Sequence, residues 1–295
     1  MTLLGRLLLT LAGLWALAGC GERPPDGFEG PPSPAMWEIG PQGAPQGWLL
    51  GTIHALPDGV EWRSPALENA LADADVLVVE VINLADQEAR AAQFAKLSIA
   101  DSEQPPLAER VPDADRPALA ALMQEGGFVP GHFHRTESWA AALTLAQVAG
   151  RSDSANGVDR ALIADFAERK VIELEGAATQ LAIFDSLPEA EQRDMLAAVL
   201  AEAQAARADP LKLARAWYAG DLATIERAGA RGILADPELR VALLTERNAA
   251  WTERIVALLR GERRLFVAVG TAHMIGPEGL VARLRSVGFE VRRVQ

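Results

Sequence analysis

The sequence predicts an α/β fold in which segments near both ends of the chain form a mixed central sheet and a large helical region caps it. Apolar runs at residues 48–50, 76–79 and 265–269 are typical of strands that are buried on both faces. The stretch from about residue 86 to 260 is rich in Ala and mostly helical in pattern. The chain of 295 residues is long enough for one large or two small domains, and we expect one domain over residues 36–295.

The first twenty residues form a predicted export signal. Arg6 precedes an apolar stretch over residues 7–18 that is too short to span a bilayer comfortably. The following Leu-Ala-Gly-Cys at residues 17–20 resembles the bacterial lipobox, whose cysteine receives lipid and becomes the new N-terminus. Cys20 is the single cysteine of the chain, which suits lipid attachment and excludes an internal disulfide. Because Gly21 rather than Asp follows it, we expect a lipid-anchored protein of the cell envelope, on the periplasmic side of the outer membrane rather than at the inner membrane.

The net charge of the chain is −12 at pH 7. Such an acidic surface argues against nucleic-acid binding and against adsorption to anionic lipid. The membrane is therefore expected to be a partner only through the acyl chains at Cys20.

Residues 21–35 are rich in Pro and Gly and contain few apolar side chains, so we expect an extended, mobile tether. Residues 36–39 alternate like a short strand, and 48–54 form the next strand, antiparallel to the first. Ser64 and Pro65 are typical of a helix start, with the helix over 66–74.

The strand expected at 76–81 contains Glu80, which must be neutralised, paired or bound to a metal because a bare buried carboxylate is very costly. The alternative is a carboxylate at a strand edge facing water. Within the helical middle, 170–175 follows a helix over 158–169 and reads as a strand with Glu175 at its exit. His132 and His134 are close in sequence but have no further ligand nearby, so we assign them to an exposed turn before a helix that begins near Glu137.

The last long helix is expected from Asp236 and Pro237 to about residue 260. Arg247 and Asn248 lie on or beside its apolar stripe, where polar groups need partners inside the fold. A strand over 265–273, a helix over 278–287 and a strand over 289–294 complete the expected sheet.

A short phrase occurs twice, as Gly-Thr-Ile-His at residues 51–54 and as Gly-Thr-Ala-His at residues 270–273. Each copy closes an apolar run, so His54 and His273 would lie at strand exits, where open α/β sheets place their ligands. We therefore expect a shared site that contains both. The competing interpretation is two unrelated strand ends with structural histidines.

Together these segments resemble the TraB/GumN family, which is similar to the Tiki proteins of animals, described as metal-dependent proteases with two Gly-x-x-His motifs. The resemblance rests on residues 48–54, 79–81, 174–175 with Gln180, 246–248 with Trp251, 266–273, 279–280 and 288–291. It implies that His54 and His273 are metal ligands or the central catalytic pair, and that Glu80 is a further ligand or a general base. It also implies that Glu175, Arg247 and Asn248 line the site.

Two histidines and one glutamate are sufficient to hold a Zn, Mn or Co ion with an open position for water. Arg247 would then stabilise a developing oxyanion. We therefore expect a metal-dependent hydrolase, similar to a metalloprotease, that acts on a peptide or small-molecule substrate. Three alternatives stay open: a metal-free hydrolase similar to erythromycin esterases with His as general base, a ligand-binding envelope lipoprotein without catalysis, and a scaffold whose His and Glu are structural.

Overall fold

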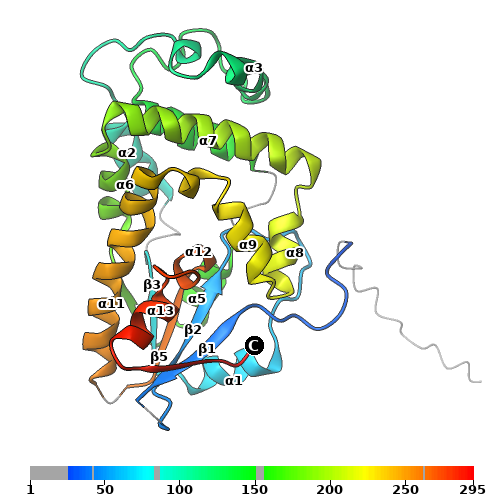
Figure 1. The fold of residues 1–295 in the computed structure, drawn as a ribbon, viewed down its shortest axis with the longest axis vertical. Helices are drawn as coiled ribbons and strands as arrows, with labels where there is room; N and C mark the ends of the chain where they lie inside the picture. The colour runs from blue at the N-terminus through cyan, green and yellow to red at the C-terminus, as the bar shows by residue number, and fades with distance from the viewer. Residues whose placement is uncertain (1–25, 42, 83–86, 151–155, 262) are drawn as a thin grey trace, which may run out of the picture.

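The computed structural model describes residues 26–295 apart from 42, 83–86, 151–155 and 262 (Figure 1). The expected export signal, with Cys20, lies outside the described residues. Within the described part of the chain, no helix has the length and apolar character needed to cross a membrane.

Six strands form one mixed sheet in the order β4-β3-β5-β2-β1-β6, which confirms the predicted α/β fold class. Strands β4, β3, β5 and β2 are parallel to one another, whereas β1 is antiparallel to both β2 and β6. The strands are β1 Met36–Gly40, β2 Gly47–Thr52, β3 Val76–Val79, β4 Lys170–Glu173, β5 Leu265–Gly270 and β6 Glu290–Arg293.

The register of the parallel strands brings their carboxyl ends to one edge of the sheet. Thr52 is opposite Gly270, and Val79 is opposite both Ala268 and Glu173. Close approach at this edge requires glycine at position 51, since a Cβ there would lie 2.8 Å from Oγ1 of Thr271. The predicted site residues that follow these strands therefore meet at one place.

The helices cover both faces of the sheet and extend into a cap (Figure 1). The helices before the long cap helix are α1 Pro65–Asp73, α2 Gln87–Leu97, α3 Arg116–Glu125, α4 Ser138–Ala149, α5 Val158–Asp165 and α6 Ala177–Asp185. The later helices are α7 Glu189–Ala208, α8 Lys212–Tyr218, α9 Leu222–Gly229, α10 Pro237–Arg240, α11 Glu246–Leu259, α12 Thr271–Met274 and α13 Leu280–Ser286.

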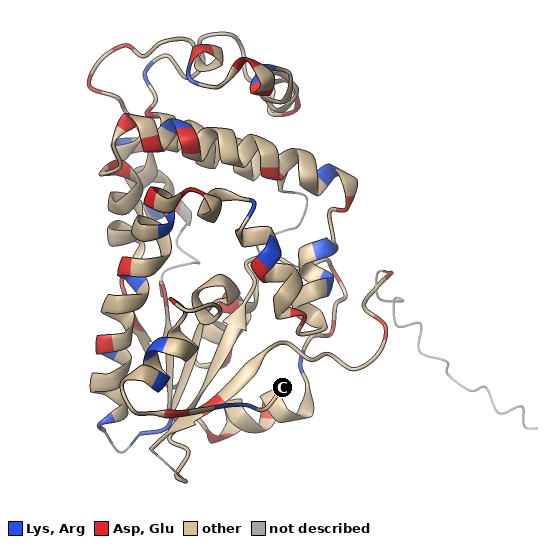
Figure 2. Ribbon diagram, in the orientation of Figure 1, with Lys and Arg blue, Asp and Glu red and all other residues tan. Residues whose placement is uncertain are grey.

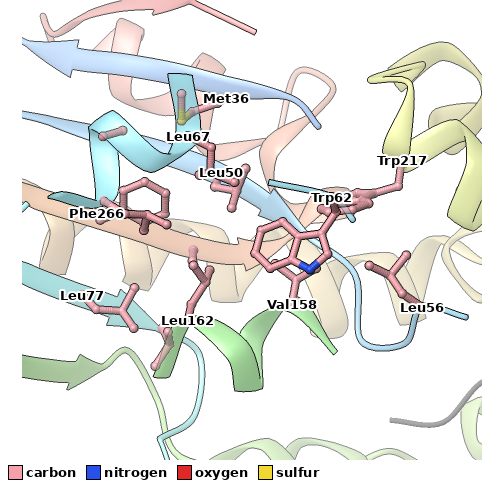
Figure 3. Close-up of a cluster of buried hydrophobic side chains, with 14 of the residues drawn as sticks. Met36, Leu50, Leu56, Trp62, Leu67, Leu77, Val158, Leu162, Trp217 and Phe266 are labelled. Atoms are coloured by element: carbon pink, nitrogen blue, oxygen red, sulfur yellow. The ribbon is translucent and has the colours of Figure 1, made fainter. Parts of the chain in front are cut away.

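Alternate strand residues supply two cores. Leu50, Leu77 and Phe266 face α1, α5 and α8 on one side of the sheet (Figure 3). Their neighbours in sequence, such as Leu49 and Val267, face α11 and α13 on the other side. This period-two pattern is what strands buried on both faces require.

A third core holds the cap together, away from the sheet (Figure 1). It is built from α3, α4 and α7, with Trp139 fully buried at its centre as a core residue. His132 and His134 are exposed in the turn before α4, as predicted. Acidic and basic residues are interspersed along α7 and α11 (Figure 2).

The structure corrects the prediction for the described part of the tether. Residues 26–35 lie on the domain, because Phe28 is only 2% exposed and packs edge-on against Tyr218 at a ring-centroid distance of 5.3 Å. The hydroxyl of Tyr218 also donates to the carbonyl of Gly30 (2.7 Å). Phe28 and hydrogen bonds to Tyr218 therefore hold this Pro/Gly-rich stretch on the core.

Several element boundaries also differ from prediction, three of them near the candidate site residues. β3 ends at Val79, so Glu80 follows the strand rather than lying inside it. β5 ends at Gly270, and His273 lies in the short helix α12 instead of on the strand. The helix expected over 236–260 is interrupted by a π-helical turn, Val241–Thr245, between α10 and α11.

Candidate functional site

A buried ionic cluster lies at the carboxyl edge of the sheet, with Arg247 at its centre. Its Nε and Nη2 donate to the two carboxylate oxygens of Glu175 at 3.0 and 2.5 Å. Nη2 also donates to Oε2 of Glu80 at 2.9 Å. The Arg247 and Glu80 side chains are each 10% exposed and that of Glu175 is 7% exposed, so all three charges are largely removed from water.

The parallel pairing of β3 and β4 continues past the strand ends and sets the two carboxylates side by side. The backbone N–H groups of Glu175 and Gly176 both donate to the carbonyl of Glu80, each at 3.2 Å. Oε1 of Glu80 accepts from the N–H of Gly270 at 2.8 Å, which ties it to β5. Gln180 on α6 reaches Oε2 of Glu80 at 3.5 Å.

The two carboxylates respond differently to burial. Burial raises the pKa of Glu175 above its usual value, and its hydrogen bond and charge interaction with Arg247 offset this only in part. Burial also acts to raise the pKa of Glu80, but His273, Arg247 and His54 outweigh it, so that the pKa of Glu80 is lowered. Glu80 is therefore ionised at pH 7, whereas the neighbouring Glu175 is easier to protonate.

His273 is buried, and its hydrogen bonds define its tautomer. Asn248 donates through Nδ2 to the carbonyls of His273 (3.3 Å) and Glu278 (2.8 Å), so its Oδ1 is left to accept from Nδ1 of His273 at 2.7 Å. Nε2 then carries the lone pair and faces Nη1 of Arg247 at 3.2 Å. Burial lowers the pKa of His273 to about 4, so the ring is neutral at pH 7.

His54 has the opposite environment. It lies in the loop after β2 with its side chain 77% exposed, and its Nδ1 lies 3.0 Å from Oδ2 of Asp159 on α5. The hydrogen bond to Asp159 raises the pKa of His54 to about 9. His54 therefore carries a proton on both nitrogens at pH 7, and within the described part of the chain its Nε2 has no hydrogen-bond partner.

The threonines of the two Gly-Thr-x-His copies form hydrogen bonds that join β2 to α5 and to α12 at the carboxyl edge of the sheet. The hydroxyl of Thr52 donates to Oδ1 of Asp159 at 2.7 Å, and the hydroxyl of Thr271 donates to the carbonyl of Thr52 at 2.9 Å. The repeated phrase thus places one histidine from each strand end and fixes the two strand ends to each other.

The π-helical turn before α11 presents Arg247 and Asn248 to the same site. The extra residue of this turn changes the direction in which the following side chains point. The carbonyl of Leu243, within the turn, accepts from Nη1 of Arg247 at 3.1 Å. Trp251, one turn later, covers the His273 ring at a centroid distance of 4.5 Å and the Arg247 guanidinium at 4.7 Å. Such π turns occur frequently at functional sites.

All five N–H hydrogens of Arg247 are directed at protein acceptors: Leu243, Glu80, Glu175 twice and His273. Stabilisation of an oxyanion by Arg247, as the sequence predicts, would require one of these contacts to be given up. The guanidinium instead holds the two carboxylates in place.

The predicted metal ligands have suitable chemistry but do not converge in this arrangement. His273 and Glu80 are both hydrogen-bonded to the Arg247 cation, and His54 is paired with Asp159. Among the described residues, no group of three or more His, Cys, Asp or Glu side chains is arranged to hold a metal ion. A divalent ion would have to displace the guanidinium.

The structure thus brings Glu80, Glu175, Arg247, Asn248 and His273 into one network, with His54 at its open side. Asp159 and the two threonines were missed by sequence reasoning. The signal for Asp159 is weak: an acidic residue in the first turn of a helix is common for electrostatic reasons alone. His132 and His134 lie in the cap and take no part.

Comparison with known proteins gives one match. The sequence model of the TraB/PrgY/gumN family matches residues 35–293, which is nearly all of the described chain. Neither a curated protein nor a solved structure matches the chain.

Proposed function

Because the chain belongs to the TraB/PrgY/gumN family and carries paired histidines beside a buried carboxylate network, we propose that it is a hydrolase of peptide or ester bonds. The observation that carries the proposal is the opposite environment of the two histidines from the same repeated phrase: exposed His54 is paired with Asp159, whereas buried His273 is hydrogen-bonded to Asn248. The pKa of His54 is about 9 and that of His273 about 4. Groups whose environments push their pKa values apart are the usual acid and base of an active site.

In the proposed reaction, His273 is the general base and His54 the general acid. A water molecule loses a proton to Nε2 of His273 as its oxygen bonds to the substrate carbonyl carbon. When the bond to the leaving group breaks, the Nε2 proton of His54 passes to the leaving nitrogen or oxygen. Water reaches the His273 lone pair only by replacing the 3.2 Å contact from Nη1 of Arg247.

The remaining residues position these two groups. Asn248 holds His273 in the tautomer with the lone pair on Nε2, and Asp159 orients His54 and keeps it protonated. Glu80 stabilises the His273 imidazolium formed during the reaction, because its carboxylate is buried in the same network. Glu175 and Arg247 hold Glu80 in place.

The test is hydrolysis of a panel of aryl esters and peptide amides by wild type, His54→Gln and His273→Gln, with His132→Gln in the cap as the matched control. Each site variant should lose about 10²-fold or more in kcat/KM, and the control should keep its activity. The wild-type pH profile should rise above pH about 4 and fall above pH about 9. Activity that persists in His273→Gln would overturn the assignment of the base.

A metal-dependent hydrolase is the second candidate. It is favoured by the fact that Nδ1 of both histidines is hydrogen-bonded to a protein acceptor, Asp159 or Asn248, which is how metal-bound histidines are usually oriented. His54, His273 and Glu80 would hold a Zn, Mn or Co ion, which would supply an activated water. Elemental analysis of wild type and His273→Ala decides: about one ion per chain that is lost in the variant supports this candidate.

We also propose that the protein is held in the bacterial cell envelope by lipid at Cys20, facing the periplasm from the outer membrane. The lipobox-like residues 17–20 support this. Cys20→Ala should move the protein from the membrane fraction to the soluble fraction. If a lipidated protein hydrolyses no ester or peptide in any condition, the ligand-binding alternative replaces the hydrolase.

A further inference from the structure

A groove lies between α5 and the loop that follows β2, the two segments that carry Asp159 and His54. It encloses about 370 Å³. Leu56, Trp62, Asn156 and Arg160 are among the residues that line it. Leu56 and Trp62, which are 1% and 8% exposed, supply its apolar lining. Both also belong to the core cluster that contains Val158 (Figure 3).

The same groove contains donors that the protein leaves unused. Among the described residues, neither the guanidinium of Arg160 nor the indole N–H of Trp62 has a hydrogen-bond or ion-pair partner. By contrast, nearby Arg63 stacks on Trp62 at 4.7 Å and is paired with both Glu68 and Asp165. Arg160 is half-buried, and no carboxylate of the described residues forms an ion pair with it, in a chain with net charge −12.

No acidic side chain is among the described residues that line the groove. Asp58, at the loop next to it, is hydrogen-bonded to the side-chain amide of Asn156. The groove therefore offers an apolar floor, one fixed positive charge and one neutral donor. That combination matches a ligand with an apolar body and a single negative charge, since a phosphate dianion would leave charge uncompensated.

The groove is coupled to the candidate active site through both of its walls. Arg160 follows Asp159, which bonds His54, and Leu56 lies two residues after His54. The N–H of Val158 also donates to the carbonyl of Ile53 at 3.0 Å, which joins the start of α5 to the loop. The groove is thus built on the same two segments that hold His54 and Asp159.

We propose that this groove is a substrate subsite that binds an apolar group bearing a carboxylate, with Arg160 as the residue that recognises the charge. The assignment of the groove as a substrate subsite rests on the proposed hydrolase function. Binding in the groove, however, is measurable without turnover.

The binding test uses 3-phenylpropionate and the neutral 3-phenylpropanol, titrated into the full-length protein by ligand-observed NMR. Wild type should bind the acid about tenfold more tightly than the alcohol, because a charge-assisted hydrogen bond is worth roughly this factor. Arg160→Leu should remove the difference. Arg260→Leu, an exposed arginine after α11 at the opposite edge of the sheet, is the matched control and should keep it.

Reversal of the charge at position 160 distinguishes loss of charge recognition from general damage to the groove. Arg160→Glu should reject the acid and favour 3-phenylpropylamine. Equal binding of acid and alcohol by wild type, or an unchanged preference in Arg160→Leu, overturns the proposal. Tighter binding of phenyl phosphate than of the acid also overturns the choice of a carboxylate.

Two peptides test whether the bound carboxylate belongs to an acidic side chain or to a chain terminus. One peptide is acetylated and amidated with an internal Glu after Phe, and the other has no acidic side chain but ends in a free Phe carboxylate. Arg160 dependence for the first indicates an acidic peptide, and for the second a chain terminus. If Arg160-dependent binding is found but neither peptide nor any ester is hydrolysed, the proposed function fails while the subsite stands.

Discussion

Replacement of Arg247 by methionine removes the cation that Glu80 and Glu175 share, while it keeps much of the apolar stem. All three side chains are at most 10% exposed, so water cannot replace the lost charge. Removal of one partner from a buried ion pair costs about 3–5 kcal/mol, because the other charge stays buried and uncompensated. We expect a loss of this size in the free energy of unfolding at pH 7.

The pH dependence of the loss follows from the same reasoning. Without Arg247, the pKa of both carboxyl groups moves upward in the folded state, because the guanidinium charge no longer opposes burial. The folded variant then binds more protons than folded wild type, so the variant loses stability relative to wild type as pH rises above about 4.5. The difference between wild type and variant should therefore be larger at pH 7 than at pH 5.

Urea unfolding at these two pH values, followed by circular dichroism, measures the effect. Arg240→Met is the control, because Arg240 pairs with Glu278 at side-chain exposures of 36% and 34%, where an ion pair contributes about 0–1 kcal/mol. Glu175→Gln in the Arg247→Met background should recover part of the loss. A loss below about 1 kcal/mol at pH 7, or one that does not change with pH, would refute the picture of a desolvated cluster.

Three further outcomes are expected. Acidification from pH 6.5 to 4 should destabilise wild type by roughly 3 kcal/mol more than His273→Gln, as measured by urea unfolding across this range. The reason is that the unfolded chain binds a proton on His273 in this range, whereas folded His273, with a pKa of about 4, stays largely neutral. Asp159→Asn should bring the pKa of His54 down from about 9 towards 6.5, as measured by NMR titration of the ring; an unmoved pKa would contradict the assigned cause. Phe28→Ala should cost about 3–5 kcal/mol of unfolding free energy, and a loss near zero would show that residues 26–35 are not part of the core.

Local sequence patterns were sufficient to predict the central strands and the edge of the sheet at which the site residues meet. Apolar runs predicted β2, β3 and β5, and the Ser64 cap predicted the start of α1, where its hydroxyl accepts from the N–H of Leu67. These signals act over a few residues, so they can be read without the fold. Repetition of Gly-Thr-x-His added a second kind of information, because two strand exits with the same residues imply one shared edge.

Pairing across the chain could not be read in the same way. Asp159 is 105 residues from His54 in sequence, and Arg247 is 167 residues from Glu80. Nothing local distinguishes Asp159 from other acidic residues in first helical turns. Likewise, the sequence could place Arg247 near the site but could not show that all its donors are used there.

The chain's own residues therefore determine which chemical groups reach the carboxyl edge of the sheet: two histidines, two carboxylates, an arginine and an asparagine. Only the tertiary structure decides what each group does. Burial and Asn248 keep His273 neutral, Asp159 keeps His54 protonated, and the π turn brings Arg247 between the carboxylates and His273. Charge and protonation depend on neighbours and on exclusion of water, and these are properties of the packed fold rather than of any segment.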